Sequence, residues 1–350
     1  MVPLIDDGSL VRIPVEVLGQ TRYFVVDTGT SATILDSRFA DRLAATGEVI
    51  SENTSGESVQ AAAYNAPDIS IDGVSVRISR VYCNDLSLQR MVIGEGCDGI
   101  LGMDILHQYS VTIDLFNKTF MMTKDNVAPA DSEKIQLGSN DGIPEVPIAI
   151  DGGIPEQLII DSGSNAAISL NQSAWDKILS PGEKHAAVSI LYSASGGSVK
   201  SSLTTKIRSI KCGSAQYSGI VCQMISQSAL SSVGLPFFRH NSVVLDFPHN
   251  ILYFQSRPGA WVDEQDMSGL HLLKQNGKVV VYSVNQTSPA ESCGIKAGDQ
   301  VENIDGEPCS KMTMKTVRAK FAGLDGEHRS VELVRGSQHF RVSITLKRVI

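Results

Sequence analysis

The strongest constraint on the fold of this chain is a pattern that the sequence uses twice. The segment VVDTGTSATILD (25–36) is matched by IIDSGSNAAISLN (159–171), and GMDILHQYSVTID (102–114) is matched by GLPFFRHNSVVLD (234–246). In the first copy, 87 residues separate Asp27 from Asp114. In the second copy, 85 residues separate Asp161 from Asp246. Matches in the same order and at nearly the same spacing predict two consecutive units of one fold, each of roughly 120 residues.

Both units are rich in alternating Val, Ile and Thr with glycine-bearing turns, a pattern that predicts a mainly β fold. The polar segment 124–142, which contains Pro and Gly, is typical of a linker. It places the first unit at residues 1–124 and the second at 125–258. Asp36 and Asn171 stand where short helices are expected to begin, and both residue types are good N-caps.

A second linker, QSRPGAWVDEQD (255–266), separates the repeat from a third unit at residues 259–350. The dipeptide at 276–277, Asn-Gly, predicts a β-hairpin. Apolar spacing predicts an amphipathic helix from Met312 to Ala322. Two strands, RSVELVRG and HFRVSITLK, are expected to close this unit.

The composition excludes several classes of function. The chain has 350 residues and a net charge of −8, so it lacks the basic surface that nucleic acid binding requires. It contains no run of 18 apolar residues, so no membrane-spanning helix is expected. The N-terminus shows no signal-peptide pattern, so the protein is either cytosolic or carries a signal ahead of this numbering. The six cysteines form no C-x-x-C pair, and either each unit holds one disulfide or all six are free buried thiols.

The repeated D-[ST]-G motif indicates chemistry. A single Asp before Gly is common in turns, but Asp27 and Asp161 each follow an apolar strand at the same position of the repeat. Two carboxylates brought together at the seam of two such units cannot both ionise, so the pair shares a proton. The ionised member can activate a water, and the protonated member can hydrogen-bond a carbonyl. This arrangement hydrolyses an amide without a metal and without a covalent intermediate.

The residues beside each aspartate repeat as well. They are Thr28, Gly29 and Thr30 in the first copy and Ser162, Gly163 and Ser164 in the second. The glycines lack a Cβ, so backbone can approach the carboxylates closely. The first hydroxyl of each triplet is expected to bond the opposite loop, and the second is expected to hold its own carboxylate in place.

These motifs resemble those of pepsin-type aspartic proteases, which carry one D-[ST]-G in each of two β lobes. The resemblance covers residues 10–255 and implies a bilobal, pseudo-two-fold fold with small lobes, closer to a fused pair of retroviral-type subunits. It implies an aspartic endopeptidase in which Asp27 and Asp161 form the catalytic dyad. The substrate is then an extended peptide or protein, and no metal or organic cofactor is needed. GILG (99–102) and SVG (232–234) resemble the apolar element that crosses beneath each catalytic loop.

A protease of this kind is expected to close a flap over its substrate. The candidates are the glycine-bearing segments 51–58 and 192–201. Tyr64 and Tyr192 lie near them, but neither matches the position of a pepsin-type flap tyrosine. The sequence leaves open which flap closes.

The third unit resembles a PDZ domain through SPAESCGIKAGD (288–299) and the following I-D-G turn. The resemblance implies that a peptide C-terminus adds as a strand beside Gly269, Leu270, His271 and Leu272, against the helix predicted at 312–322. The alternative is a PDZ fold that only packs on the protease and binds no peptide. A protease joined to a PDZ domain suggests a periplasmic or secreted protein.

Two other functions remain open. GEGCDG (94–99) matches G-x-G-x-x-G, and Asp114 lies twenty residues after Gly94, as in dinucleotide-binding folds. The second copy lacks these glycines and no βαβ units follow, so this interpretation is the weaker one. The alternative to an endopeptidase is a non-catalytic peptide-binding scaffold that retains the fold. Both D-[ST]-G motifs are intact, which favours the enzyme.

Overall fold

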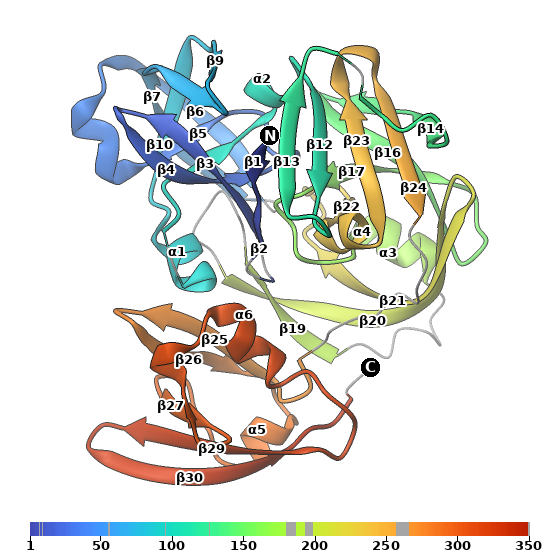
Figure 1. Ribbon diagram of the computed structural model, residues 1–350. Coiled ribbons are helices and arrows are strands. Elements are labelled where there is room, and N and C mark those ends of the chain that lie inside the picture. Colours follow the sequence, from blue (N-terminus) through green and yellow to red (C-terminus); the bar gives the residue numbers. More distant parts are fainter. Residues whose placement is uncertain are drawn as a thin grey trace.

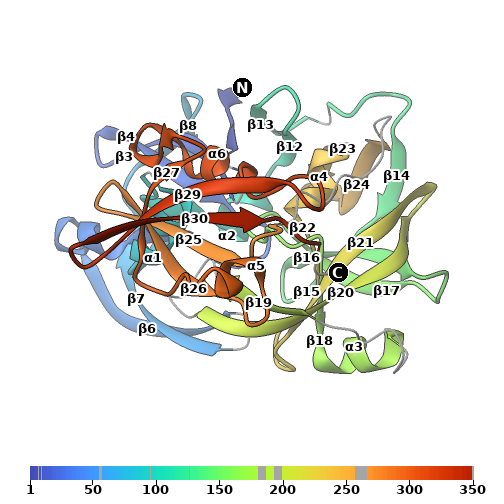
Figure 2. The same ribbon diagram turned by 90° about the horizontal axis from the view of Figure 1, so that it is seen from below.

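The computed structural model describes residues 1–6, 8, 10–54, 57–94, 96–125, 127–179, 187–192, 199–256 and 266–348. Within these residues the chain is mainly β, as the sequence predicts, and its strands form four sheets. The third unit, coloured orange to red in Figure 1, lies beside the first two, and Figure 2 views the molecule from its side. In the described ranges, no helix combines the length and apolar character needed to cross a bilayer.

The first unit forms a ten-stranded sheet with the order β6-β7-β10-β5-β11-β4-β3-β8-β9, and β2 pairs with β3. Its strands are β1 (Val2–Pro3), β2 (Ile5–Asp6), β3 (Val11–Val17), β4 (Gln20–Val26), β5 (Ile34–Asp36), β6 (Ala45–Thr54), β7 (Glu57–Asn65), β8 (Ile69–Ile71), β9 (Val74–Val76), β10 (Arg80–Asn84), β11 (Gly99–Leu101), β12 (Ser110–Asp114) and β13 (Thr119–Thr123). Its helices are η1 (Ser37–Arg42), α1 (Ser87–Ile93) and α2 (Met103–Leu106).

The second unit forms an eight-stranded sheet with the order β15-β16-β17-β22-β18-β21-β20-β19. Its strands are β14 (Glu133–Gln136), β15 (Gly138–Asn140), β16 (Ile143–Ile150), β17 (Glu156–Asp161), β18 (Ile168–Asn171), β19 (Ala187–Tyr192), β20 (Val199–Cys212), β21 (Ala215–Ile225), β22 (Ser232–Gly234), β23 (Asn241–Asp246) and β24 (Ile251–Ser256). Its helices are α3 (Gln172–Ile178), α4 (Leu235–Arg239) and η2 (Phe247–His249).

A third sheet joins the first two units. Its order is β1-β13-β12-β23-β24-β14, so strands of both units lie in one sheet. The junction is the antiparallel pair of β12 and β23, in which Val111 lies opposite Leu245. These two strands come from the second pair of repeated segments, which therefore meet in space. One continuous core fills both units, and includes Phe24 and Phe120 of the first and Trp175 of the second.

The two N-caps predicted from the sequence, Asp36 and Asn171, are confirmed. The side chain of Asp36 accepts a hydrogen bond from the amide of Arg38 and caps η1. The side chain of Asn171 accepts one from the amide of Ala174 and caps α3. Both caps satisfy amides that a helix start leaves without a partner in the helix.

The third unit has its own core and its own sheet, with the order β25-β26-β27-β29-β30 and β28 on β27. Its elements are β25 (Leu270–Gln275), β26 (Lys278–Val284), α5 (Pro289–Ser292), β27 (Gln300–Ile304), β28 (Glu307–Pro308), η3 (Cys309–Lys311), α6 (Met314–Ala319), β29 (His328–Arg335) and β30 (Gln338–Thr345). The hairpin predicted at 276–277 joins β25 to β26, and the predicted closing pair is β29 with β30.

The helix predicted from Met312 to Ala322 is shorter than expected. Met312 is extended, with φ −99° and ψ 147°, because it ends η3. The hydroxyl of Thr313 then caps α6 by accepting a hydrogen bond from the amide of Thr316. The apolar spacing that predicted the helix therefore runs beyond it at both ends.

Of the two alternatives for the cysteines, the structure supports free thiols, of which four are buried and Cys83 and Cys293 are half-buried. The structure contains no disulfide among the six cysteines, which are Cys83, Cys97, Cys212, Cys222, Cys293 and Cys309. Burial raises the pKa of the Cys97 and Cys212 thiols to about 12, so both are neutral at physiological pH.

Candidate active site

The two aspartates occupy equivalent places in the two units. Asp27 follows the last residue of β4, and Asp161 is the last residue of β17. A short parallel strand lies beside each: β11 pairs with β4, and β22 pairs with β17. The amide of Asp27 donates to the carbonyl of Leu101 over 3.1 Å. The two segments GILG and SVG thus lie against the loops that carry Asp27 and Asp161, as the resemblance implies.

The two carboxyl groups meet at the boundary between the units. Asp27 is buried, and its carboxyl group is hydrogen-bonded to that of Asp161. Each carboxylate also accepts a backbone amide of its own loop: Gly29 donates to Asp27 over 2.8 Å, and Gly163 donates to Asp161 over 2.9 Å. The sequence therefore predicted correctly that the duplicated motifs come together.

The glycines of the motifs are required by this closeness. A Cβ on Gly29 would lie 2.7 Å from Cγ of Asp161, and a Cβ on Gly163 would lie 2.4 Å from Cγ of Asp27. Both distances are shorter than any ordinary contact between carbon atoms. Each glycine thus makes room for the carboxylate of the other unit.

Thr28 and Ser162 connect the two loops beneath the carboxylates, and both are fully buried. The amide of Thr28 donates to the hydroxyl of Ser162 over 3.1 Å, and the amide of Ser162 donates to the hydroxyl of Thr28 over 3.0 Å. The two hydroxyls in turn donate to the carbonyls of Ile160 and Val26, over 2.6 and 2.8 Å. These four bonds fix the two aspartates relative to each other, as expected from the hydroxyl at this position.

The expectation for Thr30 and Ser164 was only partly correct. Their backbone amides, and not their hydroxyls, supply hydrogen bonds to the two carboxylates. The hydroxyl of Ser164 instead accepts the amide of Ala166 over 3.3 Å. Carboxylate orientation therefore depends on loop conformation, which the sequence motif does not reveal by itself.

The two carboxyl groups differ in their pKa values. Burial raises the pKa of Asp27 to about 6, even though backbone amides and the contact with Asp161 favour its charge. Burial, and then the negative charge of Asp27, raise the pKa of Asp161 well above its usual value. Because the charge of Asp27 raises the pKa of Asp161, Asp27 ionises first and Asp161 keeps the shared proton.

The sequence analysis did not predict a set of hydrogen bonds that supports the loop of Asp27. The buried Thr33 donates its hydroxyl to Asp104 over 2.6 Å and accepts the amide of Gly102 over 3.2 Å. The carboxylate of Asp104 also accepts the amide of Thr33 over 2.9 Å. The equivalent positions of the second copy are Ala167 and Pro236. The repeat therefore could not predict these hydrogen bonds.

The two predicted flap segments lie on antiparallel strand pairs, one in each unit. The flap segment 51–58 lies on the antiparallel pair β6–β7, and 192–201 begins on β19 and continues on β20. Residues 55–56 and 193–198, at the two tips, lie outside the described residues, as do the side chains around them. Both segments stay predicted flaps, and neither is favoured over the other.

The glycine-rich segment GEGCDG does not have the setting of a dinucleotide site. Gly94 ends α1 in a left-handed conformation, with φ 81°, and Gly99 begins β11. A dinucleotide fingerprint instead opens a helix, whose N-terminus binds the pyrophosphate. Asp114 accepts the amides of Phe116 and Asn117 and so closes a turn after β12.

The residues predicted for peptide binding lie at the edge of the sheet in the third unit. Leu270, His271 and Leu272 are on β25, which pairs only with β26 among the described strands. The side chains of Leu270 and Leu272 are buried in the core of this unit. Gly269 has a φ of +79°, and its amide donates to the carboxylate of Asp266 over 2.6 Å. The edge of β25 is therefore the backbone to which a peptide strand could add.

Comparison with known proteins agrees with this geometry. The aspartyl protease family model matches residues 13–105, which include the first motif, and the PDZ domain model matches residues 280–335. The chain carries an aspartyl protease domain and a C-terminal PDZ domain. The second motif, around Asp161, lies outside the first match and is supported by the internal repeat and by its contacts.

A curated relative is the carboxy-terminal processing protease CtpB of Bacillus subtilis (strain 168). It is 25% identical over 108 residues, which are 30% of this chain and 22% of that protein. The chain thus spans about a fifth of the length of the relative it matches. The similarity does not extend to the whole architecture of either protein.

Proposed function

We propose that the chain is an aspartic endopeptidase whose catalytic pair is Asp27 and Asp161. The observation that carries the proposal is the hydrogen-bonded carboxyl pair, in which each member is packed against the glycine of the opposite loop. The aspartyl protease match over residues 13–105 supports the same chemistry. The PDZ domain is proposed to bind the C-termini of peptides.

The proposed reaction uses the unequal affinities of the two groups for protons. A water between the carboxyl groups gives a proton to ionised Asp27 while its oxygen attacks the peptide carbonyl carbon. Asp161 donates its proton to the carbonyl oxygen, which gives a tetrahedral diol. Asp27 then passes its proton to the amide nitrogen as the C–N bond breaks, and Asp161 recovers a proton from the collapsing diol. The products are a carboxylic acid and an amine.

The alternative is a scaffold that binds peptides without cleaving them. A digestion assay with an unfolded protein substrate near pH 6 distinguishes the two, using wild type, Asp27→Asn and Asp161→Asn. Loss of the general acid or base is expected to lower the rate about 10²–10⁴-fold. Asp114→Asn is the matched control, because that aspartate closes a turn far from the motifs in sequence and should leave cleavage unchanged. Cleavage by either dyad variant at the wild-type rate would exclude the proposed chemistry.

A further inference from the structure

Helix α1 is an addition to the first unit that the second unit lacks. In the first unit, 14 residues separate the end of β10 at Asn84 from the start of β11 at Gly99. In the second unit, six residues separate the end of β21 at Ile225 from the start of β22 at Ser232. Since the surrounding strands correspond, the role of α1 is specific to the first unit.

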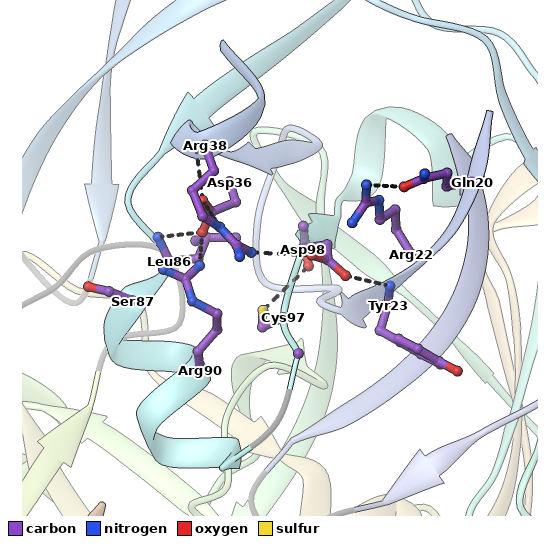
Figure 3. A network of polar contacts seen from close by, with 12 residues as sticks. Gln20, Arg22, Tyr23, Asp36, Arg38, Leu86, Ser87, Arg90, Cys97 and Asp98 are labelled. Carbon is purple, nitrogen blue, oxygen red and sulfur yellow. Dashed lines mark hydrogen bonds and ion pairs between the residues drawn. The ribbon is translucent and has the colours of Figure 1, made fainter. Parts of the chain in front are cut away.

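One face of α1 is fixed to the first unit. Ile93 packs in a small apolar cluster with Val25 and Ile100, which lie on the two strands that support the loop of Asp27. Arg90 forms an ion pair with the fully buried carboxylate of Asp36 (Figure 3). Burial disfavours the charged form of Asp36, but hydrogen bonds from Arg38 and Arg90 bring its pKa below the usual value. This face therefore holds α1 rigidly on the first unit.

The other face of α1 packs on the PDZ domain. Leu88 and Val92 are four residues apart and so lie on one side of the helix. They are buried against Leu273 of β25, with 7%, 6% and 4% of these three residues exposed. Figure 1 shows α1 beside β25 and α6, between the first unit and the PDZ domain.

The contact also involves α6, so α1 meets the PDZ domain between β25 and α6, where the PDZ resemblance implies that a peptide binds. Arg318 of α6 donates to the carbonyl of Val92 over 2.5 Å and to the carbonyl of Leu272 over 3.3 Å. A Cβ on Gly94 would lie 2.6 Å from Cγ of Met314 and 3.2 Å from Cδ of Lys274. The C-terminal turn of α1 thus fills the space beside the edge of β25, where a bound peptide would form its strand.

We propose that α1 is an internal occupant of the PDZ groove, and that a peptide with a free apolar C-terminus binds there only when α1 and the PDZ domain separate. The proposal rests on the peptide-binding role proposed for the PDZ domain, and it does not require peptidase activity. Because α1 is fixed to the first unit by Arg90 and Ile93, opening the groove moves the PDZ domain relative to that unit. The apparent affinity for peptide is then the intrinsic affinity reduced by the fraction of open molecules.

The test measures peptide binding in the full chain with Asp27→Asn, so that cleavage cannot remove the probe. The probes are fluorescent decapeptides ending in Leu, Ile, Val or Phe with a free carboxylate, and the same peptides amidated. Leu88→Ser with Val92→Ser removes the apolar contact with the PDZ domain, and is expected to lower Kd by about tenfold or more. Val74→Ser with Leu230→Ser is the matched control, because these side chains are already exposed.

A second readout needs no change in α1. Peptide binding is expected to increase hydrogen exchange of the amides at residues 88–94, including that of Gly94, which bonds to the carbonyl of Arg90 over 2.8 Å. Equal peptide affinity in both pairs of variants, with unchanged exchange at α1, would overturn occupation of the groove while leaving peptide binding intact. Binding of no free-carboxylate peptide by any variant would overturn the peptide-binding role itself, and this proposal with it. Neither result bears on the dyad, which the digestion assay tests separately.

Discussion

Thr28 and Ser162 exchange hydrogen bonds across the boundary between the two units, each amide donating to the other residue's hydroxyl. The two residues are 134 positions apart in the chain and are both fully buried. Each hydroxyl also donates to a carbonyl of the opposite strand. The pair therefore links the position of the Asp27 loop directly to that of the Asp161 loop.

Removing one of these hydroxyls should destabilise the protein. Thr28→Val keeps the shape of the side chain but leaves the amide of Ser162 and the carbonyl of Ile160 without their partner. A buried polar group without a partner costs about 1–3 kcal/mol. Urea unfolding measures the loss, and Thr28→Ser, which keeps the hydroxyl, should lose less. A Thr28→Val protein as stable as wild type would show that this link contributes little.

A methyl group on Gly163 should lower the rate of cleavage about 100-fold. The Cβ of Gly163→Ala would lie 2.4 Å from Cγ of Asp27, so the carboxylate must move. A displacement of about 1 Å at a reacting group can lower a rate about 100-fold. The control is Gly96→Ala, whose Cβ would meet no atom nearer than 3.9 Å. The comparison uses cleavage rates of the two variants, and equal rates would contradict the packing of Gly163 on Asp27.

The repeat allowed the meeting of the two D-[ST]-G motifs to be predicted, because each copy of the repeat supplies one of them. One Asp-Thr-Gly is ambiguous, but equivalent motifs at Asp27 and Asp161 require symmetric partners, and the structure brings them together. The helix caps at Asp36 and Asn171 could also be predicted from the sequence, because each cap bonds to an amide only two or three positions further along the chain. Local and repeated features were thus available from the sequence.

Features that depend on unique long-range contacts were not predictable. Thr33 and Asp104 have no counterpart in the second copy, so the repeat could not reveal their contact. The face of α1 formed by Leu88 and Val92 has the spacing of an ordinary core-facing helix, and nothing in that spacing identifies β25 as its partner. The amides that hold the two carboxylates come from loop conformation, which side-chain identity does not specify.

Stability should depend on pH through the dyad. The pKa of Asp27 is raised from 3.8 to about 6 in the folded protein. Between these values the unfolded chain has lost the proton that the folded chain still holds, so stability falls as pH rises through this window. The contribution of Asp27 to this loss is on the order of 3 kcal/mol and is complete above its folded pKa. Asp161, whose pKa is also raised by burial, adds a loss in the same direction. Asp27→Asn should therefore lose less stability than wild type between about pH 4 and about pH 7 without becoming independent of pH, which unfolding curves at the two pH values would show. A variant with the same pH dependence as wild type would assign the effect to other groups.

Reducing agents should not change stability. All six cysteines are free thiols, so no disulfide constrains the unfolded chain. Thermal unfolding with and without dithiothreitol should give the same Tm. Alkylation of the denatured, unreduced protein should modify six cysteines. Fewer modified cysteines, together with a Tm that falls on reduction, would indicate a disulfide.

The most direct test of the shared-proton dyad is the pH dependence of kcat/KM for peptide cleavage by wild type and by the two single Asn variants. The account predicts a rate that rises as Asp27 ionises near pH 6 and falls at higher pH, where Asp161 loses its proton. Both variants should lose about 10²–10⁴-fold at every pH. A wild-type rate that does not change between about pH 4 and about pH 8, or full activity in either variant, would contradict it.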